Sequence, residues 1–128
     1  MNKETKFEKR LRREWKNIIF NCIFSIAIIL IVILFYKNIL LTIILEAIVV
    51  IIGLIKWKSK LTLAVFLFGA FWGAIAEMVV IYTSGALVYS LPNILNLIPA
   101  WLFIIWGAAA AFIFETANEI KSLGVKDG

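Results

Sequence analysis

Two glutamates, Glu46 and Glu77, lie inside long apolar runs of this chain. A carboxyl group at mid-depth in a bilayer costs at least about 2.5 kcal/mol, and such residues usually face the interior of a helix bundle. At the helical rise, Glu46 and Glu77 would lie roughly 10 Å and roughly 9 Å inward from the same membrane surface. If their helices touch, the two acids would share one outward-facing cavity, with one as proton donor and the other as acceptor.

Each glutamate also has a structural interpretation as a protonated, hydrogen-bonded packing residue, and this interpretation is stronger for Glu46. Glu77 is the better functional candidate because polar residues follow it toward the outer surface, among them Tyr82, Ser84, Tyr89 and Asn93. An acid, hydrogen-bonding groups and an apolar lining would suit a lipid-like or isoprenoid ligand. The pattern predicts Glu77 and, as a second candidate, Glu46 as catalytic acids, and the four polar residues as ligand contacts.

The sequence lacks the residues that metal binding, disulfide formation and several common catalytic motifs require. The chain contains no histidine, the commonest metal ligand and neutral-pH proton carrier, and its one cysteine, Cys22, cannot form an intramolecular disulfide. No phosphate-binding loop, zinc-ligand spacing or nucleophile elbow occurs. We therefore expect neither a metal nor a cofactor, and any acid-base chemistry falls to carboxylates, tyrosines or lysines.

The elements that must position these acids are membrane-spanning helices. The chain is 63% hydrophobic and 16% charged, and its charges are grouped in blocks between long apolar runs. Because one bilayer span needs about 20 apolar residues, there is room for four spans and no separate soluble domain. We predict an all-α bundle of four transmembrane helices within residues 18–121, followed by a cytoplasmic tail at 122–128. The predicted spans are 18–36, 39–55, 61–83 and 99–114.

A basic segment precedes the first span. Phe7, Leu11, Trp15 and Ile18 recur at spacings of four and three, which places them on one helical stripe. Thr5 and the glutamate three residues later fit a helix-capping box. Residues 1–17 are therefore predicted to form a short amphipathic helix lying on an anionic membrane surface. A solvated basic tail is the alternative.

Charge distribution predicts the orientation. Of the 13 lysines and arginines, Lys37 alone would face outward if both termini were inside. Basic residues are retained on the cytoplasmic side, so we predict a multi-pass protein of the prokaryotic cytoplasmic (inner) membrane with both ends in the cytoplasm. This orientation already explains the basic head, and no nucleic-acid partner is expected.

Small and aromatic residues indicate how the helices pack. Gly69, Gly73 and Glu77 are spaced by four, and Gly107 begins a smooth run on the fourth span, so these glycines predict close helix contacts. Trp72 and Trp106 are predicted to lie in the core. Glu115 and Glu119, where the fourth helix leaves the membrane, are predicted to be solvated or ion-paired.

The uncharged segment 84–98 is too apolar for an ordinary solvated loop. Pro92 interrupts any helix that it forms. We expect the segment to lie flat in the outer interface or to dip back into the protein, because irregular backbone exposed to lipid would leave its amides unpaired.

Part of the chain resembles known proteins. The stretch Gly73-Ala-Ile-Ala-Glu77, the stretch from Tyr82 to Pro92, Pro99-Ala-Trp101 and Trp106-Gly107 resemble patterns in small prokaryotic multi-pass membrane proteins. More distantly they are similar to the carotenoid hydratase-like membrane family, over about the last 60 residues. The resemblance implies isoprenoid substrates and makes Glu77, Tyr82, Tyr89 and Trp101 counterparts of the family's characteristic residues. This chain is much shorter than those enzymes.

The favoured function is the binding, or chemical conversion, of a lipid or isoprenoid-type ligand in an outward-facing pocket around Glu77. Two alternatives stay open: a non-catalytic accessory or scaffold subunit whose small-residue faces bind a partner helix, and a small proton-coupled transporter. The expected partners are membrane lipids and a second copy of the chain or another membrane protein.

Overall fold

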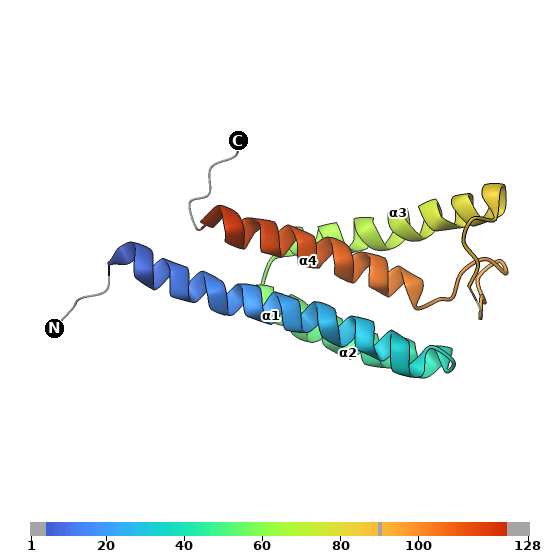
Figure 1. Ribbon diagram of the computed structural model, residues 1–128, viewed down its shortest axis with the longest axis horizontal. Coiled ribbons are helices and arrows are strands. Elements are labelled where there is room, and N and C mark those ends of the chain that lie inside the picture. Colours follow the sequence, from blue (N-terminus) through green and yellow to red (C-terminus); the bar gives the residue numbers. More distant parts are fainter. Residues whose placement is uncertain (1–4, 90, 123–128) are drawn as a thin grey trace.

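The computed structural model describes residues 5–89 and 91–122, and this part of the chain forms four α-helices and no strand. The helices are α1 (Lys6–Phe35), α2 (Ile39–Trp57), α3 (Lys60–Ser84) and α4 (Leu102–Ser122) (Figure 1). Each is long and apolar enough to cross a bilayer. The predicted all-α membrane bundle is confirmed, and the chain is a four-helix membrane protein.

Helix α1 is longer than the sequence pattern suggested. Its first turn has the predicted capping box: Thr5 Oγ1 accepts from the Glu8 amide at 3.1 Å, and Glu8 Oε2 accepts from the Thr5 amide at 3.3 Å. From Lys6 to Phe35 the helix is unbroken, so the basic head and the first span are one element (Figure 1). The physical reason is that no glycine or proline lies between those residues to end the helix.

Side-chain caps start the next two helices close to the predicted positions. Asn38 Oδ1 accepts from the Leu41 amide and Ser59 Oγ accepts from the Thr62 amide, each at 3.1 Å. Lys58 ends α2 and Gly85 ends α3 in the left-handed conformation, with φ of 51° and 64°. Because both connections are short, α1, α2 and α3 run up and down in sequence (Figure 1).

Helix α4 begins three residues after Pro99, which was predicted to start it, and continues to Ser122. The irregular segment before α4 comprises the described residues 85–89 and 91–101. It lies partly on the bundle, since Ile98 and Trp101 are buried whereas Leu95 is 79% exposed. The amides of Asn93 and Ile94 both donate to the Ile98 carbonyl, at 3.0 and 2.9 Å, and the Ile98 side chain is fully buried. Of the predicted segment 84–98, only Ile98 is buried in the bundle, and most of the other described residues are exposed.

The helices do not contact each other equally. Helix α4 packs most extensively on α3 and also on α1, α1 packs on α2, and α2 hardly touches α3. One core cluster comprises Phe24, Ile28, Val50 and Ala108, and the other comprises Ala74, Ile98, Trp101 and Leu102. In Figure 1 α3 diverges from the other helices toward the end that carries the irregular segment. We call this the loop end, and the end near both termini the terminal end.

Glycines permit the close approach of α3 and α4. A Cβ atom on Gly69 would lie 2.4 Å from the Ala110 Cβ, and one on Gly107 would lie 2.7 Å from the Phe66 ring. Both distances are too short for any side chain. These two glycines therefore lie in the contact between α3 and α4, as packing residues do.

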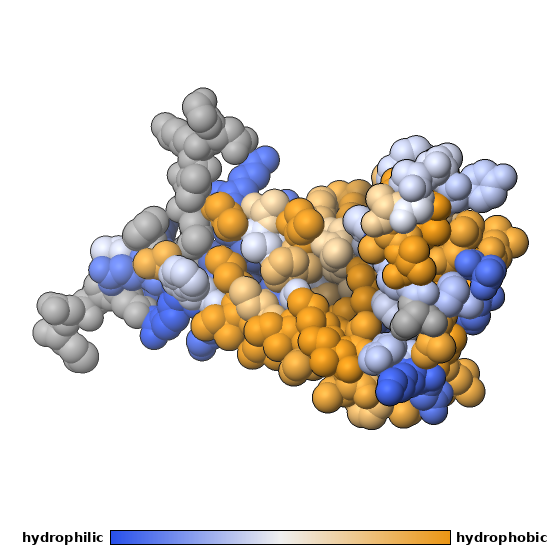
Figure 2. All heavy atoms as spheres, turned by 45° about the vertical axis from the view of Figure 1, so that its right-hand side comes forward, coloured by the Kyte–Doolittle hydropathy of each residue, from blue (hydrophilic) through white to orange (hydrophobic). Residues whose placement is uncertain are grey.

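Large apolar side chains cover the outside of the bundle. Figure 2 shows a broad hydrophobic surface across the middle of the molecule, with hydrophilic residues gathered toward its ends. Trp72, predicted to be core, belongs to this outer surface: it is 64% exposed and stacks on Phe68. The prediction was wrong because an apolar residue in a membrane helix can face either the bundle or the lipid.

Polar side chains join the helices at the terminal end. The fully buried Asn21 of α1 accepts from the Trp57 indole N–H at 2.9 Å and donates to Thr116 Oγ1 at 3.3 Å. Thr62 of α3 donates its hydroxyl to Glu115 of α4. Interhelical hydrogen bonds of this kind contribute to helix association in membranes, here between α1, α2, α3 and α4.

The same cluster corrects the prediction for Glu115. This residue is 8% exposed, so it is not solvated, and within the described part of the chain its carboxylate accepts from Thr62 rather than pairing with a basic residue. Glu119, one turn further along α4, accepts from the side-chain amide (Nδ2) of Asn17 at 3.4 Å. Asn17 and Thr62 offer neutral donors to these two glutamates from neighbouring helices, and counting charges does not consider such donors.

Replacing Asn21 with leucine should lower the free energy of unfolding by about 1–2 kcal/mol, because the Trp57 indole N–H and the Thr116 hydroxyl lose their partner. Thermal unfolding in detergent, followed by circular dichroism, measures this change. Cys22→Leu is the matched control, since Cys22 is the next residue of α1 and is exposed. Equal melting temperatures for the two variants would show that the Asn21 bonds do not stabilise the bundle.

Candidate functional site

A hollow of about 380 Å³ surrounds Glu77 at the loop end of the bundle. It draws residues from three helices and from the irregular segment, and its walls are apolar except near the carboxyl group. The lining residues are Val32, Glu77, Tyr89, Trp101, Leu102, Ile105, Trp106 and Ala109.

Two neutral donors hold the carboxylate of Glu77. The Trp106 indole N–H donates to Oε1 at 3.1 Å, and the Tyr89 hydroxyl donates to Oε2. Each carboxylate oxygen therefore has one donor from the protein. The side chain is only half-buried, so part of the carboxyl group still faces the hollow.

Gly73 positions the Trp106 donor. It lies one turn before Glu77 on α3, and a Cβ atom there would be 2.2 Å from Trp106 Cδ2. The indole therefore rests directly against the α3 backbone. Trp106 was predicted as core alone, and its bond to Glu77 was missed. The available signal was that a buried indole N–H usually finds an acceptor, and Glu77 is one of the two acids within the apolar runs.

Tyr89 reaches the site from the irregular segment. Its ring packs edge-on against Trp101, with ring centroids 6.1 Å apart. Burial, followed by the hydrogen bond and the charge of Glu77, raises the pKa of the Tyr89 hydroxyl above its usual value. The hydroxyl therefore keeps its proton at physiological pH and remains a donor to Glu77.

Trp101 lies beside Tyr89 and is 7% exposed. Its ring lines the hollow, and its buried indole Nε1–H has no hydrogen-bond partner among residues 5–89 and 91–122. Buried polar groups are nearly always paired, so an unpaired donor at this place requires an explanation.

Three predicted ligand contacts lie elsewhere. Tyr82 is 82% exposed because five residues of helix place it about 140° around α3 from Glu77. Ser84 Oγ donates to the Val80 carbonyl at 2.7 Å and accepts from the Ala86 amide at 3.1 Å, so it closes the end of α3. Asn93 Oδ1 accepts from the Ala100 amide at 2.7 Å and shapes the irregular segment. None of the three lines the hollow.

Glu46 also lies outside the hollow. It is fully buried on the inner stripe of α2, and neither carboxyl oxygen has a hydrogen-bond partner in the part of the chain that the structure describes. The cavity predicted to join Glu46 and Glu77 is not formed, because α2 and α3 hardly touch and α3 packs chiefly on α4. Equal depth in the membrane did not bring the two acids together.

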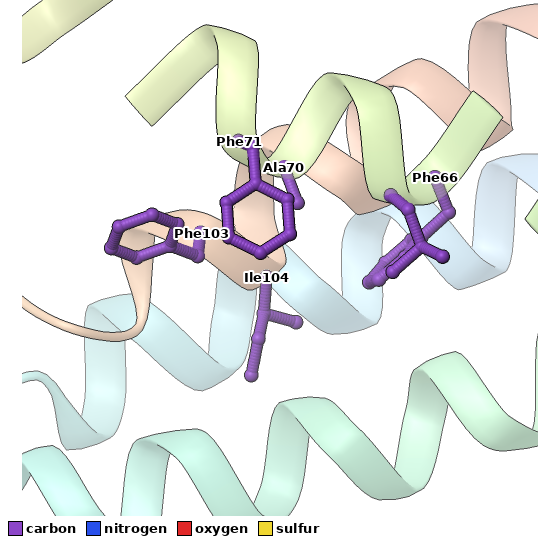
Figure 3. A pocket seen from close by; sticks show the side chains of 6 residues that line it. Phe66, Ala70, Phe71, Phe103 and Ile104 are labelled. Atoms are coloured by element: carbon purple, nitrogen blue, oxygen red, sulfur yellow. The ribbon is translucent and has the colours of Figure 1, made fainter. Parts of the chain in front are cut away.

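A second hollow, of about 360 Å³, lies between α3 and α4 (Figure 3). Its walls are Phe66, Leu67, Ala70, Phe71, Phe103 and Ile104. These residues carry no polar side-chain atom, so the hollow offers contact area to an acyl chain but no chemistry.

Across residues 5–89 and 91–122, no group of three or more acidic or cysteine side chains is placed to hold a metal ion. The fold and the site together define a four-helix membrane protein with one carboxylate-bearing hollow near the loop end. Comparisons with protein-family models, with curated proteins and with solved structures found no match to this chain.

Proposed function

We propose that this protein binds a membrane-embedded ligand of the lipid or isoprenoid type, with an apolar body in the hollow and a polar end at Glu77. The observation that carries the proposal is the position of Glu77. It is the charged side chain of a hollow whose remaining walls are apolar or aromatic. Sites for hydrophobic ligands commonly combine such walls with a few polar groups that orient the ligand.

The resemblance noted in the sequence supports the same ligand class. Of its four characteristic positions, Glu77, Tyr89 and Trp101 line one hollow, whereas Tyr82 faces away. Glu77 and Tyr89 share a hydrogen bond, so a proton could pass between this pair and a bound ligand. The proposal is binding, with proton transfer as the chemistry that the pair would support.

The proposal includes an orientation. Both termini would face the cytoplasm of a prokaryotic cell, and the hollow would open near the outer surface of the cytoplasmic membrane. The support is that basic residues concentrate at the terminal end, whereas Lys37 lies in the connection between α1 and α2 at the other end.

The contacts of three glycines weaken the alternative function, a non-catalytic accessory subunit. It required small-residue faces free to bind a partner helix, but Gly69 faces Ala110, Gly73 faces Trp106 and Gly107 faces Phe66 within the chain itself. Ligand binding is therefore the function that the geometry supports best.

Replacing Glu77 with glutamine should weaken ligand binding about tenfold or more, because hydrogen bonds to charged groups contribute about 1.5–3 kcal/mol. The probe is dodecanol carrying a diazirine on its chain, and labelling of the purified protein is read by mass spectrometry. Glu46→Gln is the matched control: it makes the same chemical change in a buried carboxyl outside the hollow.

The hollow itself is tested by filling it. Ala109→Trp should abolish labelling because Ala109 lines the hollow, whereas Ala117→Trp, at an exposed position of the same helix, should not. Labelling that persists in Ala109→Trp, or that is equal in the two glutamate variants, would overturn the proposed function.

A further inference from the structure

The hollow around Glu77 is closed along the contact between α3 and α4. A Cβ atom on Gly73 would lie 2.2 Å from the Trp106 ring. One turn away, a Cβ atom on Gly69 would lie 2.4 Å from the Ala110 Cβ. The apolar tail of a ligand whose polar end is at Glu77 therefore has no path between these two helices.

A further hollow, of about 250 Å³, lies between α1 and α4, and we call it the α1–α4 hollow. It shares two wall residues, Ile105 and Ala109, with the Glu77 hollow, so the two hollows adjoin. The lining residues of the α1–α4 hollow are Phe24, Ser25, Ile28, Ile29, Ile105, Ala108 and Ala109.

The two hollows follow one face of each helix. Residues at intervals of three and four lie on the same side of a helix. On α1, residues at these intervals line the two hollows: Ser25, Ile28, Ile29 and Val32. On α4 the same intervals relate Leu102, Ile105 and Ala109. The two hollows therefore form one elongated groove, which runs from the loop end toward the terminal end where α1 packs beside α4 (Figure 1).

The far part of this groove suits a hydrocarbon chain. None of the residues that line the α1–α4 hollow is charged, and the hydroxyl group of Ser25 is their single polar side-chain group. Phe24, Ile28 and Ala108 are buried there, so a chain in this hollow would contact the interior of the bundle. Ligand sites usually bury most of the surface of their ligand, and the α1–α4 hollow would provide this burial for the tail.

The length of the groove indicates the class of ligand. From Val32 to Ser25 the groove follows α1 for roughly 10 Å, at the helical rise of about 1.5 Å per residue. Because carbon–carbon bonds are about 1.5 Å long, an extended chain needs about eight methylene groups to cover this length. Resting on the proposed function, we infer that the ligand is a long-chain amphiphile, whose tail lies in the α1–α4 hollow when its polar end is at Glu77.

The experiment maps two photolabels placed at opposite ends of the same ligand. One dodecanol carries the diazirine beside the hydroxyl group, and the other carries it at the far end of the chain. Mass spectrometry identifies the labelled residues of the intact protein in detergent. The first probe should label the Glu77 hollow, for example at Tyr89, and the second should label Ser25 or Ile29. Excess dodecanol should remove both labels but not that on Leu34, which faces outward and is 68% exposed.

A variant fills the α1–α4 hollow without touching Glu77. Ser25→Trp should abolish labelling of Ile29 by the far-end probe, whereas the probe labelled beside its hydroxyl should still label Tyr89. Ile26→Trp, at an exposed position on the next residue of α1, is the matched control and should change neither label. The melting temperature of each variant reports whether it is folded, and the map on the unaltered protein needs no variant.

The outcomes distinguish the inference from the function on which it rests. Suppose that excess dodecanol removes the label on Tyr89, but that the far-end probe labels only outward residues such as Leu34, or labels Ile29 equally in Ser25→Trp. The Glu77 hollow then binds a ligand, but the position of its tail is wrong. If excess dodecanol removes no label of either probe, the proposed function fails as well.

Discussion

Replacing Gly73 with alanine is expected to lower the free energy of unfolding by about 3 kcal/mol, near the upper end of the usual cost of overpacking a core. The added Cβ would lie 2.2 Å from Trp106 Cδ2 and 2.4 Å from its Cγ. Either the indole moves or α3 and α4 separate, and both changes break the Trp106 bond to Glu77. Labelling by the diazirine probe should therefore fall together with the melting temperature.

The matched control for Gly73→Ala adds bulk to an exposed position of the same helix. Ala76→Val, at an exposed position of α3, should have a free energy of unfolding within about 0.5 kcal/mol of that of the unaltered protein. A double-mutant cycle then tests the contact. If Gly73 and Trp106 touch as described, Gly73→Ala combined with Trp106→Leu should cost less than the sum of the two single changes. Additive effects would contradict direct contact.

In contrast to Gly73→Ala, replacing Glu46 with leucine is expected to stabilise the protein and to raise its free energy of unfolding by about 2–3 kcal/mol. Glu46 has no exposed surface, and neither of its carboxyl oxygens has a hydrogen-bond partner among the described residues. Leucine has a similar volume, so the change removes the cost of burying a polar group without opening a cavity. Chemical or thermal unfolding in detergent measures the gain.

Glu46→Gln tests whether the ionisable carboxyl or any buried polar group causes the loss of stability. Glutamine keeps a buried polar group without a partner, so its stability should stay close to that of the unaltered protein, and only leucine should produce the gain. Labelling at the Glu77 hollow should be unchanged in both variants, because Glu46 does not line it. A loss of stability in Glu46→Leu would mean that this carboxyl group makes an interaction that the structure does not show.

Residues close together in the chain determined most of the architecture. The apolar runs predicted four spans, and α2 and α3 begin and end within two residues of the predicted bounds. The Thr5 and Glu8 capping box was also readable, because a cap depends on residues three positions apart. These features follow from sequence because span formation sums the transfer free energies of neighbouring side chains, and capping is equally local.

The tertiary structure alone decided which side chains meet. The sequence predicted a membrane depth for Glu77 but not its partners, which come from the irregular segment and from α4. The packing of Gly73 against Trp106 brings α4 within bonding distance. Glu46 had almost the same predicted depth but lies apart from Glu77. The rise per residue predicts the depth of a side chain along its helix, but it does not predict which other helix packs beside it. Lateral contacts depend on small differences in interhelical packing, which residues distant in the sequence determine together.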